Sequence, residues 1–149
     1  MKNINFLYLS FFCLLLISCA KKDPEPQKEP EPLLADQVSG KYTMNSVTAK
    51  NGTILPLPFV NRNVTLSVRA VVTKITDNEV KIVFISTVED ATSKKGDTDV
   101  LEPITVSKNN GQITGTYLND EVQFSGQNIN LIFRFDDGDE LTYKGTKDI

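Results

Sequence analysis

Apolar and polar side chains alternate along most of the chain after residue 36, and this period of two constrains the fold more than any other feature of the sequence. The alternation is clearest over residues 64–72, 80–84 and 129–135. Because successive side chains of a β-strand point to opposite faces, each of these segments would bury one face and expose the other. Strands with one solvated face are typical of antiparallel sheets. The pattern therefore predicts an all-β, antiparallel domain.

Turn-forming dipeptides separate the alternating segments. Asn51-Gly52, Asn110-Gly111 and Asp137-Gly138 tolerate the positive φ angles of tight hairpin turns. Between such turns, the pattern predicts strands over residues 40–49, 53–57, 62–75, 79–89, 99–108, 111–118, 121–126, 128–136 and 139–146. Residues 33–38 favour one short helical turn, and residues 90–98 form the longest predicted loop.

Consecutive strands joined by short turns indicate an up-and-down meander of about eight strands. Such a meander closes most economically into a barrel, because closure leaves no exposed sheet edge. A two-sheet β-sandwich is the alternative, with Pro103 or the kinked segment 53–60 as the place where the chain crosses between sheets. Residues 36–149 have a normal length for a single core, so we expect one barrel domain there.

The N-terminal segment has the parts of a lipoprotein signal peptide. Lys2 supplies a basic region, and residues 6–17 supply an apolar region that is shorter than the ~20 residues needed to span a bilayer. The run Leu16-Ile17-Ser18-Cys19 resembles a bacterial lipobox, in which the Cys becomes lipidated. We therefore expect a signal peptide over residues 1–18 and a mature chain that begins with lipidated Cys19.

A proline-rich linker follows the predicted anchor. Four of the seven prolines lie within residues 20–35, where they alternate with Glu. This composition favours an extended polyproline II conformation and excludes helix and sheet. At about 3.1 Å per residue, the linker would hold the domain roughly 40–50 Å from the bilayer. We therefore expect residues 19–35 to form the lipidated Cys and its Pro/Glu-rich tether.

The composition excludes several classes of function. The chain has no His, which removes the commonest general base, the commonest zinc ligand and the Ser–His and Cys–His dyads. Lys2 is the only charged residue before Cys19, so 15 basic and 19 acidic side chains would remain after processing, a net charge of −4. No basic run is longer than two residues, so we expect no nucleic-acid partner. We also expect no enzyme activity, no catalytic residue and no cofactor.

The densest group of carboxylates lies at residues 136–140 and offers the oxygen ligands that Ca²⁺ prefers. Its spacing is not that of an EF-hand loop, and Asp137-Gly138 is already accounted for as a hairpin turn. We therefore assign no metal site to this cluster.

The segment Val38-Ser39-Gly40-Lys41-Tyr42-Thr43-Met44-Asn45-Ser46-Val47 resembles the opening of the lipocalin-like domains of Bacteroidetes lipoproteins: a short helical turn, then Gly-x-aromatic, then a strand. The resemblance implies a calycin-type barrel with an apolar pocket. The large side chains expected to line such a pocket are Tyr42, Phe84, Tyr117 and Phe133. A barrel of eight strands is only just wide enough to be filled by side chains, so these residues could instead fill the interior.

These features predict a lipoprotein held on the outer membrane of the cell envelope, with the barrel as a binding module for a small apolar ligand or a peptide. The sequence after Cys19, Lys21-Lys22-Asp23-Pro24-Glu25, partly resembles signals that send some Bacteroidetes lipoproteins to the cell surface. The alternative function is a structural or interaction role, in which an accessory lipoprotein contacts an envelope protein and has no small-molecule ligand.

Replacing the predicted lipid-attachment residue tests the anchor. The acyl chains would attach through the Cys19 sulfur, so the Cys19→Ala variant should lose incorporation of radiolabelled palmitate and should stay unprocessed or leave the membrane fraction. Cys13→Ala changes the other cysteine of the same segment and should keep the label. A wild-type protein that takes up no palmitate would contradict the predicted anchor.

Overall fold

The structure, a computed structural model, describes residues 31–149, of which Pro32–Ile149 form one folded unit. The predicted signal peptide, Cys19 and most of the predicted linker lie outside the described residues. Within residues 31–149, no helix is long and apolar enough to cross a membrane.

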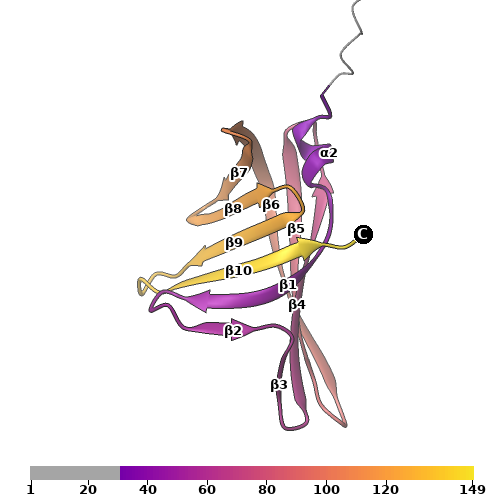
Figure 1. The fold of residues 1–149 in the computed structure, drawn as a ribbon, viewed down its shortest axis with the longest axis vertical. Helices are drawn as coiled ribbons and strands as arrows, with labels where there is room; N and C mark the ends of the chain where they lie inside the picture. Colours follow the sequence, from indigo (N-terminus) through magenta and orange to yellow (C-terminus); the bar gives the residue numbers. More distant parts are fainter. Residues whose placement is uncertain (1–30) are drawn as a thin grey trace, which may run out of the picture. The chain divides into compact units, whose positions relative to one another are not determined.

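One short helix and ten strands make up the folded unit (Figure 1). In chain order they are α2 (Leu34–Val38), β1 (Gly40–Ala49), β2 (Ile54–Pro56), β3 (Phe59–Asn61), β4 (Val64–Lys74), β5 (Glu79–Glu89), β6 (Lys94–Asn109), β7 (Gln112–Tyr117), β8 (Asp120–Ser125), β9 (Asn128–Arg134) and β10 (Glu140–Lys147). The predicted bounds of β1 and β5 are confirmed, and so is the predicted helical turn.

Eight of the strands form a closed antiparallel meander barrel with lipocalin-like topology. The order β1-β10-β9-β8-β7-β6-β5-β4 returns to β1. The closing contact between β1 and β4 is short, running only from the pair Gly40–Val72 to the pair Thr43–Arg69. The predicted meander barrel is therefore confirmed, and the sandwich alternative is wrong.

Beyond this closing contact, β1 and β4 separate, and the two short strands line the gap. The register of β1 against β10 shifts between Met44 and Ser46, and β1 then pairs with β2. On the other side, β3 pairs with β4 over residues 64–66. The kinked segment 53–60 is thus an excursion along the barrel wall, which explains its irregular pattern without a second sheet.

Pro103, the other suggested crossing point, lies within β6. The register of β6 against β5 shifts between Val80 and Ile82, opposite Pro103. A proline cannot donate to the ladder, and a bulge accommodates it while the strand continues. The chain therefore stays in the same sheet through this position.

The prediction that residues 90–98 form a long loop is wrong. β6 begins at Lys94, and only residues 90–93 form the turn. Asp90 organises this turn: its Oδ1 accepts the Thr92 and Ser93 N–H groups, each at 2.7 Å. These hydrogen bonds, led by that of Thr92, lower the pKa of Asp90 to about 2. Residues 94–100 are exposed, so this part of the strand needs no apolar alternation.

The helix α2 closes one end of the barrel. Ala35 and Val38 are buried, and the Ala35 N–H donates to the Asp77 carbonyl at 3.1 Å. Inside the barrel, the Tyr42 ring lies 6.1 Å from that of Phe124, and its hydroxyl donates to the Val38 carbonyl at 2.7 Å. One side chain therefore joins the closing strand to the helix.

The Tyr42 phenol makes the stability of the barrel sensitive to alkaline pH. Its burial raises the pKa of Tyr42 to about 12. A raised pKa in the folded state gives stability that is fully present below about pH 10 and is lost as the pH rises towards 12. Between about pH 8 and 11.5, this one group should cost the wild-type protein about 2 kcal/mol of unfolding free energy.

Urea unfolding at these two pH values measures the loss. Tyr42→Phe should be less stable by about 0.5–1.5 kcal/mol at pH 8, because it lacks the hydrogen bond to Val38, but should lose less stability on going to alkaline pH. Tyr117→Phe removes a half-buried phenol and is the control. An equal loss of unfolding free energy at alkaline pH in the wild-type protein and in Tyr42→Phe would contradict the assignment of this loss to the Tyr42 phenol.

Candidate binding end of the barrel

The end of the barrel opposite α2 is the candidate site. Neighbouring strands of a meander run in opposite directions, so alternate turns lie at the same end. The turns after β1, β3, β5, β7 and β9 lie away from the helix, at residues 50–53, 62–63, 90–93, 118–119 and 135–139. We call this end the open end, because no helix covers it in the described part of the chain (Figure 1).

Three aromatic rings fill the interior just inside the open end. The Phe84 ring centroid lies 5.1 Å from that of Phe133 and 4.8 Å from that of Tyr143, and Phe133 and Tyr143 are 5.8 Å apart. All three pairs meet edge to face, a geometry worth about 0.5–1.5 kcal/mol per pair beyond burial. Because β5 and β9 are opposite walls of the barrel, this aromatic triad spans the interior from side to side.

Little space remains beside the triad. A void next to Phe133, bordered also by Leu101, Ile104 and Tyr117, has a volume of about 10 Å³. That is about the space of one water molecule, whereas small-molecule pockets usually measure roughly 300–1,000 Å³. Two larger hollows, of about 290 and 510 Å³, lie around the β9–β10 turn, and Lys50, Asp139 and Glu140 line both. The lining of both hollows therefore combines charged groups with the Phe135 ring.

The four predicted pocket residues are divided between two aromatic groups. Phe84 is buried in the triad with half-buried Phe133, and half-buried Tyr117 borders the small void beside them. Tyr42 lies in the other group, with Phe124 near α2. Tyr143 completes the triad and was missing from the prediction, although it alternates with Leu141 on a predicted strand. That these residues line a ligand pocket stays a prediction.

Several of the exposed apolar side chains lie at the open end. They lie in or beside its turns, and we call them the apolar rim: Ile54, Val60, Val64, Val88, Leu118 and Phe135. Leu118 is 86% exposed and Phe135 is 50% exposed. Val64 and Val88 continue the alternation of buried residues, so they lie on the inward-facing side of strands that run past the packed core, and Phe135 keeps the same spacing one residue past the end of β9. A contiguous patch of exposed apolar side chains is typical of an interaction surface, so the rim is the candidate for one.

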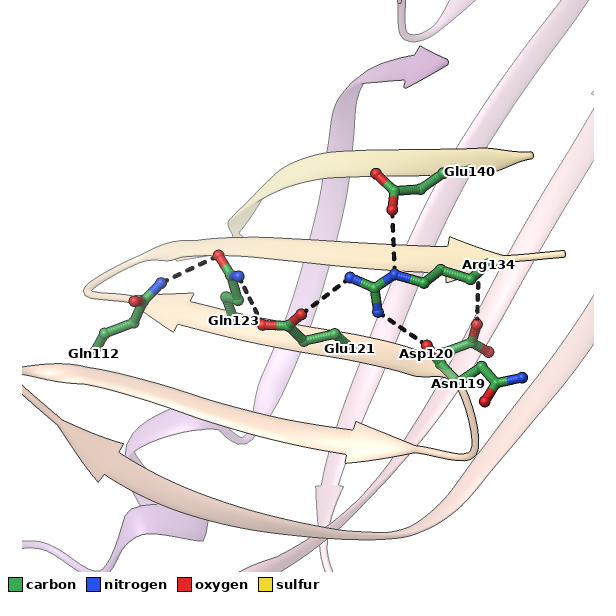
Figure 2. Close-up of polar contacts among 7 residues, drawn as sticks. All are labelled: Gln112, Asn119, Asp120, Glu121, Gln123, Arg134 and Glu140. Atoms are coloured by element: carbon green, nitrogen blue, oxygen red, sulfur yellow. Dashed lines mark hydrogen bonds and ion pairs between the residues drawn. The ribbon is translucent and has the colours of Figure 1, made fainter. Parts of the chain in front are cut away.

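Arg134 braces the rim from the outer face of the barrel, as Figure 2 shows. Its Nε donates to Glu140 at 3.2 Å and its Nη2 to Glu121 at 3.3 Å, while its Nη1 donates to the Asn119 carbonyl at 2.9 Å. Hydrogen bonds from Gln123 and Arg134 lower the pKa of Glu121. These contacts hold the turn that carries Leu118 against β9 and β10. The exposed Leu118 side chain therefore lies on a turn that is fixed by hydrogen bonds.

The acidic turn 136–140 is held by contacts of its own. The Asp139 N–H donates to Asp137 Oδ1 at 3.0 Å, and Lys50 Nζ donates to the Gly138 carbonyl at 2.7 Å. Among residues 31–149, no three acidic side chains come together in a group that would hold a metal ion. The geometry is that of a hairpin turn.

No protein-family profile matches the sequence, and no curated protein matches it. Among solved structures, a redesigned β-barrel is similar, with a TM-score of 0.46 and 14% sequence identity over 80% of this chain and 98% of that chain. A likeness of this size carries no functional information. The class defined by the fold is an eight-stranded antiparallel meander barrel.

Removing one ring of the triad should open the interior. Phe84→Ala should lower the unfolding free energy by about 3–5 kcal/mol, because Phe84 is buried against both other rings. The cavity should also bind a hydrophobic fluorescent dye that the wild-type barrel excludes. Phe135→Ala removes an exposed ring and should change stability by less than about 0.5 kcal/mol. Dye binding by the wild-type protein equal to that by Phe84→Ala would contradict a filled interior.

Proposed function

We propose that this protein is a lipid-anchored lipoprotein of the cell envelope whose barrel binds another protein through its open end. One observation carries the proposal: the aromatic triad fills the interior, while exposed apolar side chains lie on the turns and strand ends outside it. The usual lipocalin-like arrangement, with a ligand inside the barrel, would require the triad to move apart. Contact with a protein or peptide requires no such change.

The order of segments along the chain supports this arrangement. The lipobox-like run at Cys19 and the Pro/Glu-rich linker would attach the domain to the outer membrane. The described chain enters the barrel through α2, at the end away from the rim. The point of attachment and the proposed contact face are therefore at opposite ends of the domain.

Site-specific photocrosslinking in cells tests the proposal. A photoreactive phenylalanine analogue at position 118 or 135 should give discrete crosslinks to a protein. The same analogue at position 75 is the matched control, because Ile75 is also an exposed apolar residue but lies in the β4–β5 turn at the α2 end. Position 75 should give none of these adducts.

Two results would count against the proposal. One is crosslinking at position 75 as strong as at 118 and 135, which would indicate non-specific contact. The other is native mass spectrometry of the purified protein that shows a retained small apolar molecule, which would favour the ligand-binding alternative.

A further inference from the structure

The first half of β6 has a strand partner on one side only. β5 pairs with β6 over Lys94–Thr105, whereas β7 pairs with it only over Val106–Asn109. In the described part of the chain, no strand lies on the β7 side of residues 94–105. Figure 1 shows the β5–β6 hairpin extending beyond β2. We call residues 94–101 of this free border the β6 edge.

The pairing with β5 shows which backbone groups of the β6 edge are free. In an antiparallel ladder, hydrogen-bonded pairs alternate with non-hydrogen-bonded pairs. The bond from the Asp90 N–H to the Ser93 carbonyl, at 2.9 Å, marks a hydrogen-bonded pair at the hairpin. Counting from it, the N–H and C=O groups that point away from β5 are those of residues 94, 96, 98 and 100.

One contact supports this assignment. The Thr98 N–H donates to the Oδ1 of the neighbouring Asp97 at 2.9 Å, so it does not bond to β5. The Asp97 carboxylate thus occupies the place that the carbonyl of an added strand would take. This contact caps the edge in the free protein, since charged side chains are a common protection of sheet edges.

The charges beside the β6 edge select the partner. Asp97 and Asp99 lie two residues apart on one face of the strand and are exposed, and no ion pair among residues 31–149 includes either of them. The negative charge of Asp99, added to the larger effect of burial, raises the pKa of Tyr143. A strand added beside β6 would place side chains about 4.5–5.5 Å from those of Asp97 and Asp99. Basic residues opposite Asp97 and Asp99 would fit there, while Lys95, on the same face, favours an acidic or uncharged residue opposite it.

We propose that the β6 edge binds an extended, basic segment of a partner protein by β-strand addition. This inference rests on the proposed function and names the surface and the partner's chemistry. Main-chain hydrogen bonds to residues 94–100 hold the segment, and alternate Lys or Arg side chains pair with Asp97 and Asp99. A basic side chain draws the Asp97 carboxylate away from the Thr98 N–H, which is then free to donate to the incoming strand.

A second copy of the chain is the competing occupant of the β6 edge. Antiparallel pairing of residues 94–100 with the same residues of another copy would place Asp97 opposite Asp97, which is destabilising, but would also place Lys95 opposite Asp99 on either side. A segment with basic residues opposite both Asp97 and Asp99 has no repulsive pair at these two positions, and self-association through the edge is the outcome that would contradict it.

Peptide binding to the purified lipoprotein in detergent micelles tests the proposal. The probe is a fluorescent, end-blocked peptide of alternating Lys and Val, and the same peptide with Glu in place of Lys is its control. The Lys peptide should bind and the Glu peptide should not, as measured by fluorescence anisotropy. Amide hydrogen exchange should slow at residues 94, 96, 98 and 100 when the Lys peptide is bound.

Two pairs of variants separate the contribution of the main-chain hydrogen bonds from that of the Asp97 and Asp99 charges. Thr98→Pro removes an N–H that points away from β5, a position where an edge strand tolerates proline, and should weaken binding about tenfold or more. Thr98→Val keeps that N–H and should bind as the wild type does. Asp97→Asn with Asp99→Asn should weaken binding and reduce its salt dependence, whereas Asp136→Asn with Asp137→Asn should not. Thermal melting checks that each variant is folded.

The outcomes distinguish binding at the β6 edge from the proposed function, which is protein binding through the open end. Equal binding of the Lys and Glu peptides, unchanged binding by folded Thr98→Pro, or a dimer that Thr98→Pro abolishes would overturn β-strand addition by a basic partner. If crosslinks then still form from position 118, the proposed function stands and only the edge assignment fails. If no position at the open end gives a crosslink, the proposed function fails as well.

Discussion

The rest of the structure depends on a short contact between β1 and β4. Four residue pairs, from Gly40–Val72 to Thr43–Arg69, turn an open meander into a closed barrel. The same stretch of β1 carries Tyr42, which is fully buried and bonds to the Val38 carbonyl of α2. Nearby, a Cβ at Gly145 would lie only 2.7 Å from Met44 Sδ, so glycine lets β10 pack closely on β1. Closure, helix docking and the close packing of β10 on β1 therefore meet at one end of the barrel.

The geometry that closes this end opens the other one. Past Thr43, β1 bends at a bulge and leaves β4 for β2, while β4 continues with β3 and β5. On the opposite side, β6 pairs with β7 only from Val106 onward, so the earlier residues of β6 have no partner there in the described part of the chain. The exposed apolar rim and the β6 edge both follow from these two separations. They are properties of how the strands diverge, and the aromatic triad marks the depth to which the interior stays packed.

Local pattern was enough to predict which residues form strands and which side chains face inward, but not how far the core extends. Val64, Val88 and Phe135 obey the alternation as well as Val68 does, yet only Val68 is buried. Residues 94–98 were missed for the opposite reason, since a strand exposed on both faces has no alternation to detect. That Phe84 and Phe133 meet depends on β5 and β9 being opposite walls, a fact of closure that no local pattern contains.

A free sheet edge is an aggregation hazard, and proteins usually cover it, shorten it or charge it. Here the edge stays long, and charge is the protection: Asp97 caps the Thr98 N–H, and Lys94 pairs with Glu89 at 2.9 Å. The proposed anchor would confine many copies to one membrane surface and raise their local concentration, so self-pairing would be a constant risk. Protection by a carboxylate differs from protection by burial because the right counter-charge can reverse it. Basic side chains opposite Asp97 and Asp99 would supply that counter-charge and free the Thr98 N–H for a strand partner.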